Sequence, residues 1–410
     1  MRILYIQQYF KPPNQPGSTR SYWISKTLIE KGYDVTVVCH ANIMQGKNQD
    51  KRIEETVIEG IRVISILNAY SNNMNVKQRI WSFLKFMFFS TFVALKEKDV
   101  DLVFASSTPL TVAVPALMRK LFRKTPYIFE VRDLWPEAPI QLGFIKNKVL
   151  IKFLKWFEKT VYKNSEHVIA LSPGMQEGVA KYIPKEKISM IPNMSKIDMF
   201  WVREKDMNLN DRFGLSNKTF KIIYFGTLGF ANGIDYLMDA ISLLENKKIE
   251  NIEFIFMGDG VKIKDLQYLS ANLLNVKVSI LSRQPMDIVS AVVNNCDICI
   301  CTFSNFPILK TNSPNKLFDS FSAGKPIIVN SDGWTKELVE NYNCGFYVNP
   351  ENVFDLADKI LLLKENPELA AEMGFNARKL AEEKFDKSIL CNDFYMLIKH
   401  WEESNKLSKK

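Results

Sequence analysis

The residues with the clearest chemical potential lie in segment 313–319, which reads Ser-Pro-Asn-Lys-Leu-Phe-Asp and precedes an apolar run that follows Gly324. Proline after serine favours the first turn of a helix, and Gly324 favours its end. A helix N-terminus presents unpaired N–H groups to an anion, and Lys316 adds a full positive charge there. Asp319, about one and a half turns further on, could accept hydrogen bonds from the hydroxyls of a ribose. This spacing indicates a nucleoside diphosphate site, and a simple capped helix is the alternative.

Two loops that carry glycine follow expected strands and could let the backbone approach a phosphate. The first contains Gly17 within Pro-Gly-Ser-Thr-Arg, and the second contains Gly226, Gly229 and Gly233. A glycine has no Cβ, so a ligand can come close to its backbone. The first loop lacks the glycine spacing of the dinucleotide fingerprint, and the second lacks its downstream acidic residue. A dehydrogenase is therefore disfavoured.

Apolar runs alternate with glycine-bearing loops and helical patterns in both halves of the chain. This alternation is typical of βαβ units and predicts an α/β fold with two doubly wound, parallel-sheet domains. Such domains bind ligands at the carboxyl ends of their strands, here in a cleft between the two. We expect helices at 20–31 and 235–244, and strands at 3–6, 35–39, 100–105, 127–131, 167–171, 220–225, 252–257, 276–281 and 297–302, with a further buried strand after Gly324.

The length and composition of the chain limit the number of domains and the kinds of site it can contain. A chain of 410 residues with 47% hydrophobic residues predicts two well-packed domains and not one core. Residues 1–6 are an expected buried strand, so no targeting segment is expected. Cys296, Cys299 and Cys301 have a spacing that could suit a metal, yet they alternate with isoleucine in an apolar strand, and the chain has only 3 histidines. Buried thiols in a reducing cytosol are the preferred interpretation.

The net charge of +9 concentrates beside apolar residues. Segment 146–163 combines six lysines with aliphatic and aromatic residues, which is typical of a basic amphipathic helix at an anionic membrane. Segment 80–95 is strongly apolar, but it contains Lys85 and is shorter than the roughly 20 residues of a spanning helix. It could be a buried core helix or enter one leaflet. We expect a peripheral membrane protein, and no nucleic acid partner because no single arm carries the charge.

The ordered set of motifs resembles the GT-B glycosyltransferases, and in detail the retaining family 4. The resemblance covers nearly the whole chain, and its order is more specific than any one motif. The version of segment 130–136, Glu-Val-Arg-Asp-Leu-Trp-Pro, looks like the branch that builds bacterial capsule, O-antigen and exopolysaccharide units on a lipid carrier. The matching elements are the Gly17 loop and segments 130–136, 171–172, 191–193, 224–226, 256–260 and 315–326.

The resemblance implies the domains and the nucleotide site. It implies an acceptor-side domain at 1–195, a nucleotide-sugar domain at 196–386, and a last helix at 387–410 that packs back on the first domain. Asp319 would hold the ribose, and Lys316 with nearby N–H groups the diphosphate. Gly258 and the Arg283 loop would flank the base. The full set of implied binding residues is Gly17, Ser18, Gly226, Thr227, Gly258, Arg283, Thr311, Asn312, Ser313, Asn315, Lys316, Leu317 and Asp319.

The chain departs from the family pattern at charged positions. The paired acid eight positions before Asp319 is Thr311 here, and the usual Arg and Lys of the second domain's first loop are Thr227 and Asn232. The missing cations would stabilise a departing diphosphate. Arg283, Lys316, Arg20 and Arg132 are candidate replacements. An inactive, degenerate copy is the alternative.

Catalysis on this pattern depends on positioned cations and N–H groups, because transfer from a nucleotide sugar releases a charged diphosphate. The expected catalytic residues are Asp133, Lys316 and Arg283. Asp133 would contact the acceptor or the sugar, with Glu130 as a second acidic candidate, unless Arg132 and Asp133 form a structural ion pair. No metal and no cofactor are expected, since the nucleotide sugar is a substrate.

The resemblance implies the function. We expect retaining transfer of a sugar, preferably an N-acetylated hexosamine, from a UDP-sugar to a polyprenyl-diphosphate-linked saccharide. The protein would be cytoplasmic and peripheral on the inner face of the cell membrane. A GT-B sugar-nucleotide epimerase and an inactive membrane-associated binding protein are the alternatives.

Overall fold

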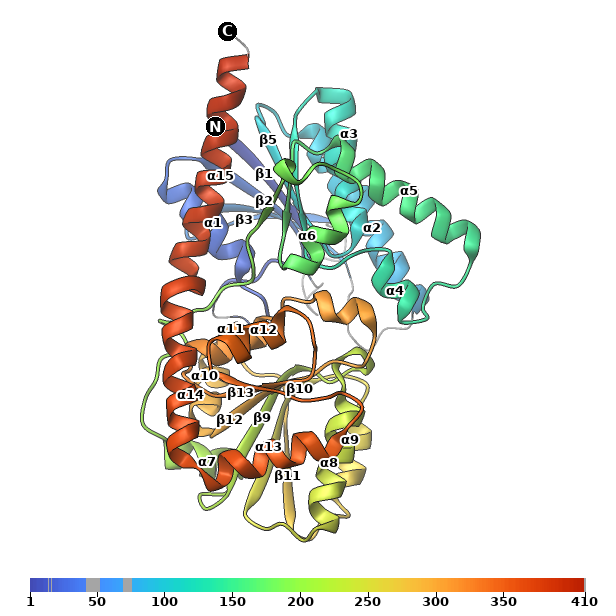
Figure 1. Ribbon diagram of the computed structural model, residues 1–410. Coiled ribbons are helices and arrows are strands. Elements are labelled where there is room, and N and C mark those ends of the chain that lie inside the picture. The colour runs from blue at the N-terminus through green and yellow to red at the C-terminus, as the bar shows by residue number, and fades with distance from the viewer. Residues whose placement is uncertain (14, 16, 42–51, 69–75, 409–410) are drawn as a thin grey trace. The chain divides into compact units, whose positions relative to one another are not determined.

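The computed structural model describes residues 1–13, 15, 17–41, 52–68 and 76–408 of the chain (Figure 1). Contacts divide the chain into two compact units. Unit 1 holds Met1–Pro13, Gly17–Pro192 and the residues from Ser388 onward, and unit 2 holds Asn193–Lys387. The main change of unit thus falls at Asn193, two residues before the end of the expected first domain.

Unit 1 is built on an eight-stranded sheet with the order β3-β4-β2-β1-β5-β6-β7-β8. All neighbouring strands are parallel except β3 and β4, which form an antiparallel pair at one edge. The inner strands are buried along their length, as expected for a parallel sheet covered on both faces. The strands are β1 (Arg2–Gln7), β2 (Asp34–Ala41), β3 (Ile53–Ile58), β4 (Ile61–Leu67), β5 (Leu102–Ser106), β6 (Tyr127–Val131), β7 (His167–Ala170) and β8 (Ile188–Met190).

Seven α-helices surround this sheet in the described part of unit 1. The last of them packs by aromatic contacts: the ring centroids of Phe104 and Phe394 lie 4.7 Å apart, and those of Tyr33 and Tyr395 lie 6.2 Å apart. The helices are α1 (Arg20–Glu30), α2 (Val76–Lys96), α3 (Ala113–Arg123), α4 (Glu137–Gln141), α5 (Lys148–Asn164), α6 (Pro173–Ala180) and α15 (Lys387–Ser408), which belongs to unit 1 from Ser388 on.

Unit 2 has a six-stranded, fully parallel sheet with the order β11-β10-β9-β12-β13-β14. Its strands are β9 (Phe220–Thr227), β10 (Ile252–Asp259), β11 (Val276–Leu281), β12 (Ile298–Cys301), β13 (Ile327–Val329) and β14 (Gly345–Tyr347). Its helices are α7 (Met207–Phe213), α8 (Ile234–Asn246), α9 (Ile263–Ser270), α10 (Met286–Asn295), α11 (Asn315–Ser322), α12 (Trp334–Asn341), α13 (Val353–Glu365) and α14 (Pro367–Leu380). The expected α/β class with two doubly wound sheets is confirmed.

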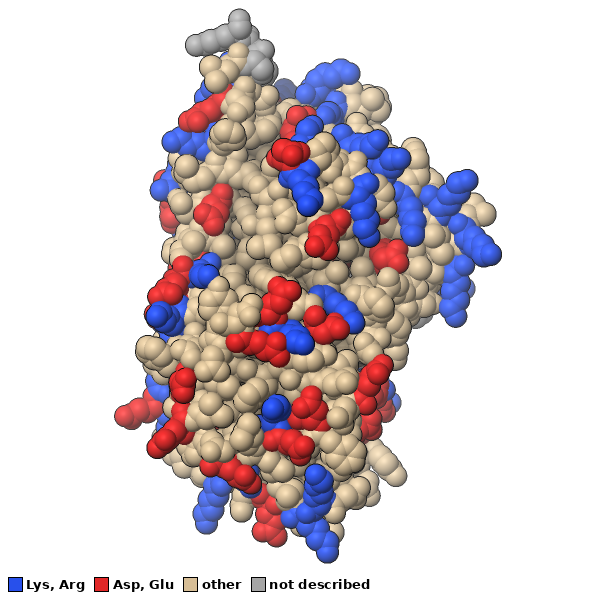
Figure 2. Space-filling view, in the orientation of Figure 1, with Lys and Arg blue, Asp and Glu red and all other residues tan. Residues whose placement is uncertain are grey.

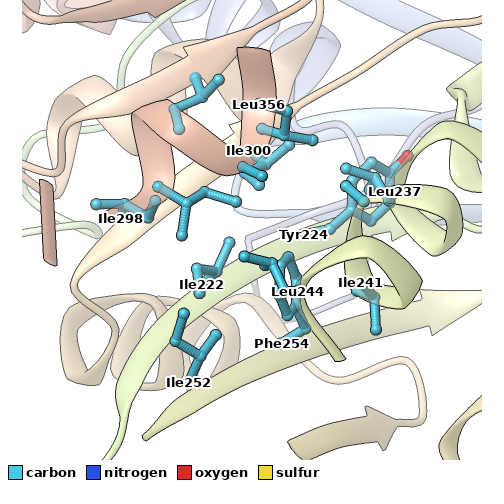
Figure 3. Packing of buried hydrophobic residues seen from close by; sticks show 14 of the residues in the cluster. Ile222, Tyr224, Leu237, Ile241, Leu244, Ile252, Phe254, Ile298, Ile300 and Leu356 are labelled. Atoms are coloured by element: carbon cyan, nitrogen blue, oxygen red, sulfur yellow. The ribbon is translucent and has the colours of Figure 1, made fainter. Parts of the chain in front are cut away.

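A buried cluster on one face of the unit 2 sheet holds β9 in place (Figure 3). Ile222 and Tyr224 of β9 meet Leu237, Ile241 and Leu244 of α8 in this cluster. Burial of each such aliphatic side chain contributes about 1.5–3 kcal/mol. The cluster therefore fixes the strand whose carboxyl end carries the glycine-bearing loop.

The sequence prediction omits β3, β4, β8 and β14. β3 carries exposed polar residues at the sheet edge, and β8 and β14 are only 3 residues long. β3 and β4 are joined by a tight turn in which both Glu59 and Gly60 have positive φ, of 47° and 86°. β3, β8 and β14 thus lack the long apolar run on which the prediction depends, whereas β4 has such a run and the prediction overlooked it.

Three cysteines in β12 and at the end of α10 are buried thiols. Cys296, Cys299 and Cys301 are buried free thiols, and burial raises the pKa of Cys299 to about 12 and that of Cys301 to about 11. The expected burial of these thiols is confirmed. Within the described ranges, no cluster of His, Cys, Asp and Glu could hold a metal ion, and no helix is long and apolar enough to cross a membrane.

Candidate functional site

The N-terminus of α11 lies beyond the carboxyl end of β12, where a short 3₁₀ helix (Pro307–Thr311) leads into it. Pro314 stands at the N-cap in an extended conformation, and no side chain accepts a hydrogen bond from the first turn as a cap. The Leu317 N–H donates to the Pro314 carbonyl at 3.1 Å, so the N–H groups of Asn315 and Lys316 are the ones that this turn offers to an anion. The helix predicted from segment 313–319 is confirmed.

Lys316 points from α11 onto the end of β9. Its Nζ lies 3.7 Å from the ring centroid of Tyr224 and 3.6 Å from the position that a Cβ on Gly226 would occupy. The Nζ atom is buried and has no hydrogen-bond partner within the described structure. Burial lowers the pKa of Lys316 to about 8. A desolvated ammonium whose nearest neighbour is an aromatic face would be stabilised by an anionic ligand.

Glycines bring the backbones of β9 and β10 close together beside this ammonium. Gly226 and Gly258 are register partners, and a Cβ on Gly258 would lie 1.8 Å from the carbonyl oxygen of Gly226. Gly226 has a φ of 131°, which disfavours a side chain there as well. Gly226 and Thr227 are exposed at the carboxyl end of β9. Gly258 is thus needed for the close packing of β9 and β10. The lack of side chains at Gly226 and Gly258 also keeps this edge open to a ligand.

Asp319 is buried and forms an ion pair that the sequence prediction missed. The Nζ of Lys196 lies 2.6 Å from Oδ1 of Asp319. Both side chains are almost fully buried. Burial raises the pKa of Asp319, and the charge of Lys196 opposes this rise. Lys196 therefore offsets part of the cost of burying the Asp319 carboxylate inside unit 2.

The segment from Asn193 to Lys196 fastens the start and the middle of α11. The Asn193 side-chain amide donates to the Ser313 carbonyl at 2.5 Å, and the Asn193 backbone N–H donates to Ser313 Oγ at 3.3 Å. Ser195 Oγ donates to the Phe318 carbonyl at 2.9 Å. The Ile-Pro-Asn motif was the available signal for this contact, but it did not reveal that its partner is Ser313.

Other implied binding residues lie around α11 or on a neighbouring loop. Thr311, in the acidic position of the family, donates its hydroxyl to the Ile308 carbonyl at 2.7 Å. Asn312 and Ser313 follow it directly, before α11 begins. Arg283 is exposed on the loop after β11, which lies two strands from β9, so roughly 10 Å separate these strands. Lys316, Gly226 and Thr227 are therefore close together, and Arg283 is further along the same edge.

In unit 1, the Gly17 loop is held by Arg132, which follows β6. Gly17 has a φ of 137°, and Ser18 Oγ accepts from the Arg132 guanidinium at 3.2 Å. Asp133 accepts a long hydrogen bond of 3.4 Å from the Thr108 hydroxyl. Burial raises the pKa of Asp133 to about 6, although the charge of Arg132 opposes this rise. Asp133 is thus a carboxyl group that exchanges a proton close to neutral pH.

Arg20 and Glu130 pair with each other in the interior of unit 1. Nε and Nη2 of Arg20 donate to Glu130 Oε1 at 2.9 and 2.8 Å, and both side chains are fully buried. Ser106 Oγ donates to the other Glu130 oxygen at 2.6 Å, and Arg20 also donates to the Ile191 carbonyl at 2.9 Å. The prediction of Arg20 as a ligand-binding cation and of Glu130 as an acceptor-side acid is therefore wrong. Their charges are balanced internally and hold β5, β6 and α1 together.

Residues 17–194 match the family "Glycosyl transferase 4-like domain", and residues 207–380 match "Glycosyl transferases group 1". The fold is similar to that of HepE from Anabaena, solved in complex with UDP and glucose, with a TM-score of 0.71, 18% identity and coverage of 98% of this chain and 100% of that one. The chain is a glycosyltransferase of the GT-B fold.

Curated relatives of this glycosyltransferase are distant. An E. coli enzyme, UDP-Gal:alpha-D-GlcNAc-diphosphoundecaprenol alpha-1,3-galactosyltransferase, is 25% identical over 57% of this chain and 62% of its own length. A Campylobacter jejuni enzyme, N,N'-diacetylbacillosaminyl-diphospho-undecaprenol alpha-1,3-N-acetylgalactosaminyltransferase, is 22% identical over 73% of this chain and 77% of its own length. Alpha-D-kanosaminyltransferase from Streptomyces kanamyceticus is 20% identical over 57% of this chain, and the match spans 60% of that enzyme.

Proposed function

We propose that this glycosyltransferase moves a sugar from a UDP-sugar to a polyprenyl-diphosphate-linked saccharide with retention of anomeric configuration, in bacterial surface polysaccharide synthesis. The observation that carries the proposal is the buried ammonium of Lys316, which has no hydrogen-bond partner in the described structure and lies beside the uncapped start of α11. A diphosphate would satisfy both the ammonium and the N–H groups.

Lys316 would act most strongly as the sugar leaves. Breaking the bond between the sugar and the diphosphate places a full extra charge on the leaving oxygens, and a pre-positioned cation stabilises this charge without reorganisation. Gly226 and Thr227 leave room for the phosphates at the end of β9. Arg283, further along the same edge, would flank the base or add a second cation.

Asp319 and Asp133 have different proposed roles. Asp319 would accept hydrogen bonds from the ribose hydroxyls, while Lys196 balances its charge. Asp133 would contact the acceptor hydroxyl or the donor sugar, and a pKa of about 6 suits proton transfer near neutral pH. The backbone at Gly17 and Ser18, whose loop Arg132 holds, has room for a phosphate because Gly17 carries no side chain. The reaction needs no metal or cofactor in this proposal.

The names of two relatives support the proposal of a lipid-linked acceptor. Two enzymes that this chain resembles are named for diphosphoundecaprenol-linked substrates, and one of them is named for UDP-Gal. One relative transfers N-acetylgalactosamine by its name, which agrees with an N-acetylated hexosamine as the preferred donor sugar. We therefore assign the capsule or O-antigen class of pathway to this chain as a proposal.

A lipid-linked acceptor requires work at a membrane, and α5 supports a peripheral attachment at the inner face. Figure 2 shows basic side chains gathered over α3 and α5. Lys152, Lys155 and Lys159 are exposed on α5, although Lys155 also lies 3.3 Å from Glu137. Each lysine near an anionic surface contributes about 1 kcal/mol. Charge reversal of the three residues to Glu should abolish sedimentation with anionic vesicles and leave thermal stability unchanged.

The reaction is tested with a synthetic polyprenyl-diphosphate sugar and labelled UDP-sugars, followed by NMR determination of the product's anomeric configuration. We expect a lipid-linked product that keeps the α configuration of the donor, and no turnover by Lys316→Ala. A lipid product of inverted configuration would contradict the retaining assignment. Free sugar or an epimer without lipid product would favour the sugar-nucleotide epimerase, and nucleotide binding without turnover would favour an inactive binding protein.

A further inference from the structure

Helix α2 is apolar on two opposite faces, and only one of them is covered. Ser82, Phe86, Ser90, Val93 and Ala94 are buried against the rest of unit 1. The opposite face is exposed, and it carries Ile80, Trp81, Leu84, Phe88 and Phe92. A helix that is hydrophobic all round is normally enclosed in a core or in a membrane.

The exposed face is a continuous stripe and not a set of scattered side chains. Trp81, Leu84, Phe88 and Phe92 follow one another at intervals of three and four residues, which places them along one side of the helix. Trp81 is 61% exposed, Phe88 68% and Phe92 55%. Exposed apolar patches of this kind on soluble proteins mark a surface that another apolar phase covers.

The charges of α2 select an anionic partner. The helix spans Val76–Lys96 and contains four basic residues and no Asp or Glu. Lys96 stays beside the stripe, with Nζ 5.9 Å from the ring centroid of Phe92. Aromatic residues with flanking cations and no carboxylate are the composition of helices that lie in the headgroup region of anionic bilayers. A carboxylate-free, aromatic stripe fits this surface better than it fits a typical protein partner.

We propose that the exposed face of α2, Ile80, Trp81, Leu84, Phe88 and Phe92, inserts into the outer part of an anionic lipid monolayer. The inference deepens the membrane contact of the proposed function and rests on it. α5 would supply attraction by charge, and α2 would supply apolar anchoring. Because apolar burial is not screened by salt, the two contributions separate in experiment.

The test compares Phe88→Ser/Phe92→Ser with Phe375→Ser in the full chain. Phe375 on α14 is a matched control, since it is 69% exposed on unit 2. Vesicle binding is measured with phosphatidylglycerol and phosphatidylcholine vesicles at low and high salt, with no nucleotide sugar or acceptor present. We expect the double variant to bind phosphatidylglycerol vesicles about 100-fold more weakly, because it lacks two aromatic groups that the wild type would bury in lipid. The control should bind as wild type.

A second measurement locates the helix in the lipid. Brominated phosphatidylglycerol should quench the fluorescence of the wild type, and Trp81→Phe should lose part of this quenching. Equal binding by the double variant and the control, or equal quenching in Trp81→Phe and wild type, would overturn the proposal. A lipid-free dimer that Phe88→Ser/Phe92→Ser dissociates would overturn it in favour of a second copy of the chain. Transfer to a short-chain, water-soluble acceptor is independent of these results, so it separately tests the proposed reaction.

Discussion

Replacing Lys316 by Met should stabilise the protein and weaken its nucleotide binding at the same time. Burial lowers the pKa of Lys316 from 10.5 to about 8, which corresponds to a cost of about 3 kcal/mol for keeping the side chain charged at pH 7. Methionine retains an apolar stem beside the Tyr224 ring and carries no charge. The free energy of unfolding should therefore rise by up to about 3 kcal/mol in the absence of ligand. Loss of a charge-assisted contact to the diphosphate should weaken UDP binding by about 1.5–3 kcal/mol.

Urea denaturation and calorimetric titration with UDP measure the two effects. The stability difference should narrow as the pH rises from 8 towards 10.5, because the folded wild type then holds a neutral Lys316 while the unfolded chain still binds the proton. Lys336→Met is a matched control in the same unit, since its Nζ lies 4.4 Å from the Tyr347 ring centroid. A Lys316→Met protein less stable than wild type at pH 7, or one with unchanged UDP affinity, would refute the reasoning.

One further prediction also concerns Lys316, and two concern Glu158 and Gly258. UDP affinity of the wild type should fall above about pH 8, where Lys316 loses its proton, and titration in buffers of different ionisation enthalpy should reveal proton uptake on binding near that pH. Burial raises the pKa of Glu158 to about 7, so the contribution of Glu158 to stability is present at low pH and is lost as the pH rises through 7. The Glu158→Gln variant should therefore match the urea stability of the wild type near pH 4 and exceed it at pH 8. Gly258→Ala should yield little folded protein, because the added Cβ would lie 1.8 Å from the Gly226 carbonyl oxygen, whereas Gly229→Ala, with its nearest contact at 3.4 Å, should fold as wild type in circular dichroism.

The buried charge pairs could not be predicted from the sequence. Arg20 and Glu130 are 110 positions apart, and Lys196 and Asp319 are 123 apart, yet each pair is within ion-pair distance in the fold. When the neighbours of Arg20 and Glu130 are unknown, an arginine after a glycine loop and a glutamate at the end of a strand suggest ligand contacts equally well. The sheet places the ends of β5 and β6 next to α1, and only this arrangement shows that Arg20 and Glu130 form an ion pair inside the core.

The sequence by itself determined the class of fold and the helix that begins at Asn315. Apolar runs of strand length, glycine after strands and proline before a helix act over a few residues, so they are visible without tertiary contacts. Segment 313–319 placed Lys316 at a helix start because helix caps are local. The tertiary structure decided the rest: it set Lys316 over Tyr224, gave Asp319 its partner Lys196, and left one apolar face of α2 uncovered. Burial and pairing depend on which distant segments pack together, and no local pattern contains that information.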